Sequence, residues 1–486
     1  MLEWLGRNGP LHEGLVAAPP SRVLGSAGVA APLPQRLVLD SSTDSQCTKG
    51  DELVVLKRYE DGHFTFYQDS VQTGDPDRAV TAEQLQRMAD FYREYGQPVI
   101  EDYFGGVSDI DGNGRIIVVV SSMVTSGTAA FVWSGDFFTS ERCAASNEGE
   151  FIYFSAGVIR GQDEGNWQSL ETLVHEMKHV SSLKKSIDRS AALPGLATVY
   201  HPSWIEEGTA EIAGNTATRF AWHAMGGPSP SARVNATLMR ETGFRSVGGE
   251  TRILPEFYGM ALRLLRTQGY LSSQPNALTH DPTGASADHS VYGSGFHFHR
   301  WLGDAFGDAA RAPGADADWF LRQNSSSFPP GISGIEQATG RSFSELLTSY
   351  TVATLLNDDD FDVPPLNEGF TSIDFASGVE LFCFALSQGE YDVLVANLEP
   401  GESPPCTNDE GVFEPSGPNG RYPWPVTAAA DGTNTQLFGA DVFEGTSGNG
   451  GLRIHDFVSE GTAGAEVRVE VARSPSDARI VIVRVR

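Results

Sequence analysis

The stretch ETLVHEMKHV, residues 171–180, decides how this 486-residue chain is interpreted. His175 and His179 are four residues apart in a helical context, so both imidazoles project from one helix face. Two neutral imidazoles at that spacing can bind one tetrahedral metal ion, and Glu176 beside them can act as a base on a water at that ion. The alternative is that the two histidines are bystanders, because the HExxH pattern also arises by chance. The stretch predicts a helix that carries a zinc site.

A second stretch, PSWIEEGTAE at residues 202–211, follows the first in sequence and contains three glutamates. We expect a helix that begins near Ser203, with Ser203 and Glu206 in the spacing of a capping box. Glu207 is then the predicted third metal ligand, offered from an adjacent antiparallel helix. Glu206 competes for that role, but the capping box already uses it. Glu211 lies one turn beyond Glu207 and is predicted to orient a liganding histidine, the alternative being a solvated charge on the helix face.

HExxH followed by W-x-x-E-G-x-A resembles the gluzincin clan of zinc metallopeptidases, with the hyicolysin-like family as the nearest match. The resemblance covers roughly residues 45–358, and the zinc-ligand motifs are its only specific part. It implies a zincin-like domain that binds one catalytic zinc ion through His175, His179 and Glu207. It also implies a zinc-dependent endopeptidase that acts on a protein or peptide substrate, with Glu176 as general base. The alternatives are a non-catalytic zinc-binding surface or adhesion protein on the same fold, and an interaction module whose histidines are vacant.

The segment YGSGFHFHRWLGDAFG at residues 292–307 matches a further pattern of this clan. By resemblance, Tyr292 is the hydroxyl donor that stabilises the oxyanion, and the alternative is a core aromatic residue at a helix start. His297 and His299 point to different faces of the helix, and we expect packing or surface roles for them.

The segment FVWSGDFF, residues 131–138, is expected to be a strand that lines the cleft and pairs with extended substrate. Its Trp133 and Phe137 could contact substrate, although alternating aromatic residues more often belong to a core. Aminopeptidases of this clan carry a motif that holds the substrate amine, whereas this segment offers only Asp136. Endopeptidase is therefore the better interpretation.

The sequence as a whole predicts an α+β chain. We expect a tail or linker over residues 1–36 and a zincin-like metallopeptidase domain over residues 37–360, β-rich above and helical below. A C-terminal all-β, sandwich-like domain is expected over residues 361–486. Within the second region, Ile116 to Val120 predicts a fully buried strand. Thr81 and Gln84 predict the capped start of a helix that extends to about residue 95.

The loop DIDGNGR at residues 109–115 has a partial calcium-loop pattern. Asp109, Asp111 and Asn113 match positions one, three and five, but position twelve is Val120 where a bidentate glutamate is needed. A tight turn between two elements is the favoured interpretation, and a Ca²⁺ ion is the alternative.

The charge balance argues against a nucleic-acid partner. The chain has 34 basic and 63 acidic residues and a net charge of −29, so it lacks the basic patch that phosphate recognition requires. No apolar run is long enough to predict a membrane span, and the sequence leaves the oligomeric state open.

The four cysteines, Cys47, Cys143, Cys383 and Cys406, allow three pairings and show no metal-ligand spacing. Cys383 and Cys406 are predicted to form a local disulfide in the β-rich region. An even number of cysteines favours an oxidising compartment, and we expect a secreted, periplasmic or cell-surface protein, although residues 1–36 contain no recognisable signal peptide.

Overall fold

The computed structural model describes residues 51–234, with gaps at 74–78, 122–123, 125–127, 165–166 and 197, and then residues 290–307, 316–355 and 370–373. It also describes three strands, at 36–39, 244–247 and 250–253, and the single residues Cys47 and Leu238. Residues 1–35 of the predicted tail, most of the predicted β domain and the proposed Cys383–Cys406 disulfide lie outside the described residues, whereas Arg36 begins a strand.

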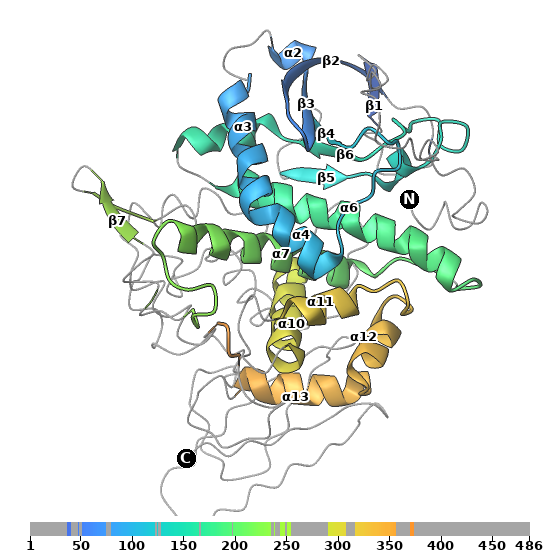
Figure 1. Cartoon of the computed structure of the whole chain (residues 1–486), viewed down its shortest axis with the longest axis vertical. Helices are drawn as coiled ribbons and strands as arrows, with labels where there is room; N and C mark the ends of the chain where they lie inside the picture. Colours follow the sequence, from blue (N-terminus) through green and yellow to red (C-terminus); the bar gives the residue numbers. More distant parts are fainter. Residues whose placement is uncertain are drawn as a thin grey trace, which may run out of the picture.

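A mixed sheet forms the upper part of the molecule in Figure 1, with the order β1-β2-β3-β4-β6-β5. Its centre is parallel, because β3 pairs with β4 and β4 with β6 in the same direction. The outer pairs are antiparallel, and β5 lies at the end of this strand order. The strands span β1 Arg36–Leu39, β2 Asp51–Glu60, β3 Phe64–Asp69, β4 Ile116–Val120, β5 Ala130–Val132 and β6 Phe151–Phe154. A separate hairpin joins β7 Phe244–Val247 to β8 Glu250–Ile253.

Helices form the rest of the described structure, and α6 crosses directly below the sheet in Figure 1. Below it lie α7, α10 and the shorter helices that follow. The α-helices are α2 Ser70–Thr73, α3 Ala82–Phe91, α4 Gln97–Phe104, α5 Ala156–Arg160, α6 Gln168–Ala192, α7 Ser203–Ala224, α10 Ser290–Phe306, α11 Ala317–Gln323, α12 Ile332–Thr339 and α13 Phe343–Leu355. The predicted α+β class is confirmed for this part of the chain.

The central strand β4 matches its predicted bounds and is covered on both faces of the sheet. All five of its residues are buried, as its uninterrupted apolar sequence predicts for a strand covered on both sides. Ile116, Val118 and Val120 pack into the large core that includes the helices. Ile117 and Val119 face a smaller apolar cluster on the opposite side.

The helix predicted from Thr81 begins as expected but continues further. Thr81 and Gln84 form both bonds of a capping box at the start of α3. A π-helical turn over Tyr92–Gly96 then carries the chain directly into α4, which has a proline in its first turn. The first turn of a helix tolerates proline, because its backbone N–H groups have no carbonyl partner within that helix.

The strand predicted for FVWSGDFF is wrong beyond its first two residues. β5 ends at Val132, and Ser134–Phe137 forms a 3₁₀ turn. At Gly135 a Cβ atom would lie 2.7 Å from the Trp133 ring, so the turn folds back over its own tryptophan. The Ser-Gly-Asp sequence is typical of such a turn, and this local chemistry outweighs the aromatic alternation.

A disulfide between Cys47 and Cys143 joins two segments separated by 96 residues in sequence. Both cysteines are buried, and Ala144 donates its backbone N–H to the Cys47 carbonyl. The bond ties the chain ahead of β2 to the loop that follows the 3₁₀ turn.

Helices α7 and α10 cross with their backbones in direct contact, at Gly208 and Gly295. A Cβ atom on Gly208 would lie 2.5 Å from the Gly295 carbonyl carbon, and a Cβ atom on Gly295 would lie 2.5 Å from the Trp204 carbonyl oxygen. No real side chain fits at either position. Gly208 follows Glu207, and Gly295 lies one helical turn after Tyr292, so this crossing sets how two predicted site residues approach each other.

The last described segment, Phe370–Ile373, packs on α10. Asp304 accepts hydrogen bonds from the backbone N–H groups of Thr371 and Ser372, and Phe370 packs against His297. The boundary expected at residue 360 stays a prediction. No helix in the described part of the chain combines the length and apolar character needed to cross a membrane.

Candidate functional site

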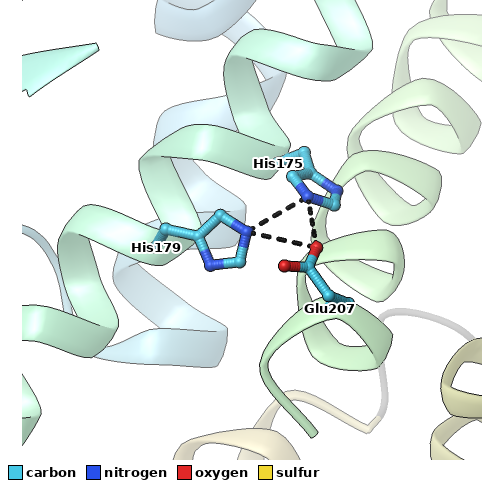
Figure 2. Close-up of side chains that lie close together, drawn as sticks. All are labelled: His175, His179 and Glu207. Carbon is cyan, nitrogen blue, oxygen red and sulfur yellow. Dashed lines mark hydrogen bonds and ion pairs between the residues drawn. The ribbon is translucent and has the colours of Figure 1, made fainter. Parts of the chain in front are cut away.

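His175, His179 and Glu207 come together as predicted, with both histidines on α6 and the glutamate on α7 (Figure 2). The Nε2 atom of His175 lies 3.1 Å from His179 Nε2 and 3.1 Å from Glu207 Oε2. The remaining side of this triangle, from His179 Nε2 to Glu207 Oε2, is 3.5 Å. Three candidate ligand atoms therefore surround one point.

The triangle has the dimensions that a zinc ion requires. Zinc binds nitrogen and oxygen ligands at about 2.0–2.2 Å with tetrahedral angles, which places the ligand atoms about 3.3 Å apart. Two neutral imidazole nitrogens and one carboxylate oxygen also form a typical catalytic donor set, which leaves the fourth position for water. The donor atoms and their spacing thus fit a zinc ion.

The electrostatics of the cluster favour a positive charge at its centre. Burial alone disfavours charge on His179, but the Glu207 carboxylate overcomes it and the pKa of His179 rises to about 10. His179 and His175 in turn hold the pKa of Glu207 far below its ordinary value, although burial acts in the opposite direction. A metal ion would take the place of the proton that these groups otherwise share.

Glu176 is buried beside His175, on the same helix. Burial raises its pKa above the ordinary value, and the Glu207 carboxylate acts in the same direction, while the two histidines oppose it. A raised pKa brings a carboxylate closer to the range in which it can accept and return a proton near neutral pH. The environment of Glu176 therefore suits a general base.

Glu211 lies behind His175, on the side away from the ligand cluster. Its Oε1 atom is 3.6 Å from His175 Nδ1, and its side chain is 7% exposed. A solvated helix-face charge is therefore the wrong interpretation for Glu211. A carboxylate at the second ring nitrogen of a ligand fixes the tautomer and orientation of the imidazole.

Glu206 does not cap α7, so the capping box predicted for Ser203 and Glu206 is wrong. The residue before the helix is Pro202, and no side chain caps this end. Lys178 instead donates to Glu206 Oε2 at 2.6 Å and to the Glu206 carbonyl at 3.1 Å. The Lys178 side chain is fully buried, and a buried ammonium group needs a charged partner more than a helix end needs a cap.

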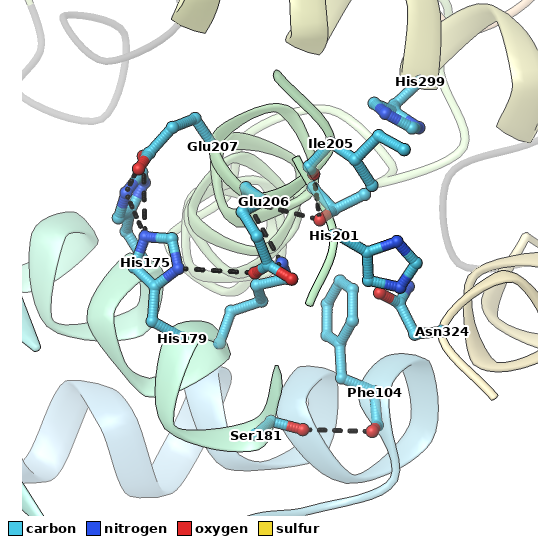
Figure 3. Close-up of polar contacts among 12 residues, drawn as sticks. Phe104, His175, His179, Ser181, His201, Ile205, Glu206, Glu207, His299 and Asn324 are labelled. Atoms are coloured by element: carbon cyan, nitrogen blue, oxygen red, sulfur yellow. Dashed lines mark hydrogen bonds and ion pairs between the residues drawn. The ribbon is translucent and has the colours of Figure 1, made fainter. Parts of the chain in front are cut away.

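Through this pairing Glu206 stands behind the second histidine. Its Oε2 atom lies 3.6 Å from His179 Nδ1, while Glu207 leaves α7 on a different side (Figure 3). Burial raises the pKa of Glu206, but Lys178 and His179 outweigh it and hold the pKa well below the ordinary value. Each predicted histidine ligand thus has a carboxylate at its Nδ1 atom. Sequence reasoning missed Lys178, whose only signal is its place between two histidine ligands on the helix.

Tyr292 lies against the ligand cluster. Its ring stacks on the His175 imidazole with the centroids 6.1 Å apart, and its side chain is partly exposed. The glycine crossing of α7 and α10 brings it there. The structure thus brings all six predicted site residues to one place, whereas their chemical roles stay predictions.

His297 and His299 are packing residues, because both are fully buried. His299 Nδ1 lies 2.9 Å from Gln323 Nε2, and its ring stacks on Trp204 (Figure 3 shows His299 apart from the ligands). Burial lowers the pKa of His299 to about 3, so it is neutral at physiological pH.

The residues around β5 divide between core and surface. Phe137 is buried in the core, as expected for most alternating aromatic residues, so it does not offer the possible contact with substrate, while Trp133 is half-buried. Asp136 is fully buried and bound by Asn147 and Tyr153, so its position does not suit a substrate amine. β5 itself remains at the end of the sheet, and α6 packs close to it.

The fold and the site define a helix-borne centre of two histidines and one glutamate, with a buried glutamate and a tyrosine beside it. Neither a protein-family model nor a curated protein sequence matches this chain. What the centre does must therefore be inferred from its own geometry.

Proposed function

We propose that the chain is a zinc-dependent endopeptidase of the gluzincin type. The observation that carries the proposal is the triangle of His175 Nε2, His179 Nε2 and Glu207 Oε2, with sides of 3.1, 3.1 and 3.5 Å. A mixed sheet above the metal-binding helix, with further helices below it, agrees with a zincin-like domain. The Cys47–Cys143 disulfide supports export to an oxidising compartment.

Each residue of the site has a defined task in peptide hydrolysis. Zinc, when bound, supplies a Lewis acid that lowers the pKa of water and polarises the scissile carbonyl. Glu176 accepts the proton of the attacking water and returns it to the leaving amine. Tyr292 donates a hydrogen bond to the oxyanion that develops on the carbonyl oxygen. Glu211 and Glu206 hold the two imidazoles with Nε2 directed at the metal.

The surroundings of the site support cleavage within a chain. In the described residues β5 has β6 on one side only, so its outer edge can pair with an extended polypeptide. The one carboxylate of this segment, Asp136, is committed to buried bonds and is not available for a substrate amine. Together these features favour an endopeptidase over an aminopeptidase.

The test is cleavage of an unfolded protein such as casein by the full chain. A zinc chelator should abolish cleavage, and added zinc should restore it. Glu176→Gln should lower turnover at least about 100-fold, because general acid–base catalysis contributes 10²–10⁴-fold. The variant should still bind one zinc ion at this centre, because Glu176 is not a ligand.

Asp188→Asn is the matched control, since Asp188 is an exposed carboxylate on the same helix that forms a surface ion pair with Lys184. It should cleave like the wild type. A Glu176→Gln variant with wild-type turnover contradicts the proposal. A folded, zinc-loaded wild type that cleaves nothing would instead favour the non-catalytic zinc-binding protein.

A further inference from the structure

A second cluster of carboxylates lies outside the site described above, at one end of the central strands. Oxygen atoms of Asp109, Asp111 and Glu150 all lie within 4.8 Å of one another. Asp109 is exposed, Asp111 is half-buried and Glu150 is fully buried. The cluster is thus open to solvent on one side and closed by the protein on the other.

The sheet topology explains why these residues meet. β4 and β6 are parallel neighbours, so the residues that precede them lie at the same edge of the sheet. Ile117 donates its backbone N–H to the Glu150 carbonyl, and Ile110 donates its own to Glu150 Oε1 at 2.8 Å. A Cβ atom on Gly149 would lie 2.8 Å from Asp111 Oδ2, so the two segments are in direct contact.

The loop that carries the two aspartates is shaped by its glycines. Gly112 and Gly114 have φ angles of +69° and +71°, which other residues rarely adopt. The backbone N–H groups of Asn113 and Gly114 donate to Asp111 Oδ1 and Asp109 Oδ1. This fixed turn accounts for the Asp-Gly-Asn-Gly sequence, but it does not account for Glu150.

Among the described residues, only one oxygen of the buried Glu150 carboxylate has a clear partner, the Ile110 N–H group at Oε1. Within the described part of the chain, its Oε2 atom has no hydrogen bond of normal geometry, and no lysine, arginine or histidine there forms an ion pair with a carboxylate of the cluster. Burial raises the pKa of Glu150 to about 7 and that of Asp111 to about 6, although backbone N–H bonds to both carboxylates, and the Ser108 hydroxyl near Glu150, act in the opposite direction. A buried oxygen without a partner is costly unless a ligand satisfies it.

We propose that Asp109, Asp111 and Glu150 bind a calcium ion. All three offer hard carboxylate oxygens, which calcium prefers, and none offers the nitrogen or sulfur that zinc prefers. The loop matches the first ligand positions of a calcium loop, and Glu150, just before the neighbouring strand β6, supplies the carboxylate that Val120 cannot. The exposed side leaves room for the water ligands that complete six to eight contacts.

The ion would lie where three parts of the structure meet, at the end of the sheet where β4 and β6 begin. Glu150 leads into β6, the two aspartates precede β4, and Gly149 donates its backbone N–H to the Asp136 carbonyl in the 3₁₀ turn after β5. Calcium would therefore stabilise the folded state of the sheet, independently of any catalytic activity.

The experiment measures calcium binding and thermal unfolding on the full, zinc-loaded chain. After treatment with a calcium-selective chelator, added CaCl₂ should raise Tm by at least about 3 °C in a saturable way, and the same concentration of MgCl₂ should raise it far less. Equilibrium dialysis should find one calcium ion fewer per chain in Glu150→Gln than in the wild type. The amide side chain of this variant keeps an oxygen for the Ile110 N–H group, so the fold should persist.

Glu141→Gln is the matched control, because Glu141 is an exposed glutamate in the loop just before Glu150. It should bind calcium like the wild type. If Glu150→Gln does not fold, Asp109→Asn tests the same site from its exposed side and should weaken binding at least about 10-fold. Unchanged calcium binding in these variants, or an equal response to magnesium, would overturn the proposal.

Discussion

Lys178→Met tests the buried ion pair that supports the second histidine ligand. Methionine keeps the length of the lysine stem and removes the ammonium group. In the native protein that group is fully buried and reaches only Glu206 among the described carboxylates, at 2.6 Å. Removing it leaves the Glu206 charge without its main counter-charge.

The expected loss of stability can be estimated from the burial of the two partners. Removal of one member of a buried ion pair costs about 3–5 kcal/mol. Glu206 is 19% exposed, so solvent screens part of its charge and we expect a value near the lower end, about 3 kcal/mol. The double variant Lys178→Met/Glu206→Gln has no unpaired charge and should recover about 2 kcal/mol of that loss.

The assay is urea unfolding followed by tryptophan fluorescence, in excess chelator so that metal binding does not contribute to stability. Zinc affinity is measured separately by competition with a chromophoric chelator. There Glu206→Gln should weaken zinc binding about 10-fold, because the carboxylate behind His179 is lost. Lys178→Met with wild-type stability, or a double variant no more stable than Lys178→Met, would refute the reasoning.

Three further predictions concern the other parts of the site and the core. Glu211→Gln should weaken zinc binding about 10- to 100-fold and leave the fold intact, and equal affinity in a competition assay would contradict its role behind His175. Val132→Pro should raise KM about 2- to 10-fold with little change in kcat, because proline removes an N–H group that could bind the substrate backbone. The Ser155 N–H group donates to the Ala129 carbonyl, so Ala129 faces β6 with its hydrogen-bonding groups. Successive residues of a strand alternate in this respect, so the Val132 N–H group points away from β6, at the open edge of the sheet. An unchanged KM on a peptide substrate would count against β5 as the substrate-binding edge. His299→Gln should make stability depend less on pH. The His299 imidazole gains a proton at pKa 6.5 in the unfolded state and only at about 3 in the native state, so the wild type loses stability as the pH falls between these values. The loss should be up to about 1.4 kcal/mol per pH unit greater than in the variant. Parallel urea midpoints for the two proteins between pH 6 and 4.5 would disprove that account.

Local patterns in the sequence were sufficient for those features that depend on neighbouring residues. The apolar run Ile116–Val120 predicts its strand correctly, because five consecutive aliphatic residues require burial on both faces. The Thr81–Gln84 capping box also forms as predicted, since both bonds lie within one turn. The two histidines share a helix face for the same reason.

Features that depend on long-range contacts were not predictable in this way. Glu206 was predicted to cap α7, but it pairs instead with Lys178, which lies 28 residues earlier and is buried against it. The third carboxylate of the second cluster, Glu150, lies 39 positions after Asp111, and only the pairing of β4 with β6 brings them together. In FVWSGDFF the aromatic alternation was visible, but the turn at Gly135 determines the structure.

The glycine crossing of α7 and α10 has a mechanical consequence for the candidate site. Helix interfaces that switch between two states do so by repacking side chains, and at Gly208 and Gly295 there is no side chain to repack. We therefore expect the two helices to shift together at this point of contact, so that the spacing between Glu207 and Tyr292 is preserved. If the site cleaves a polypeptide as proposed, we expect any opening to come from displacement of the β5 edge over α6, with the α7–α10 pair staying in place.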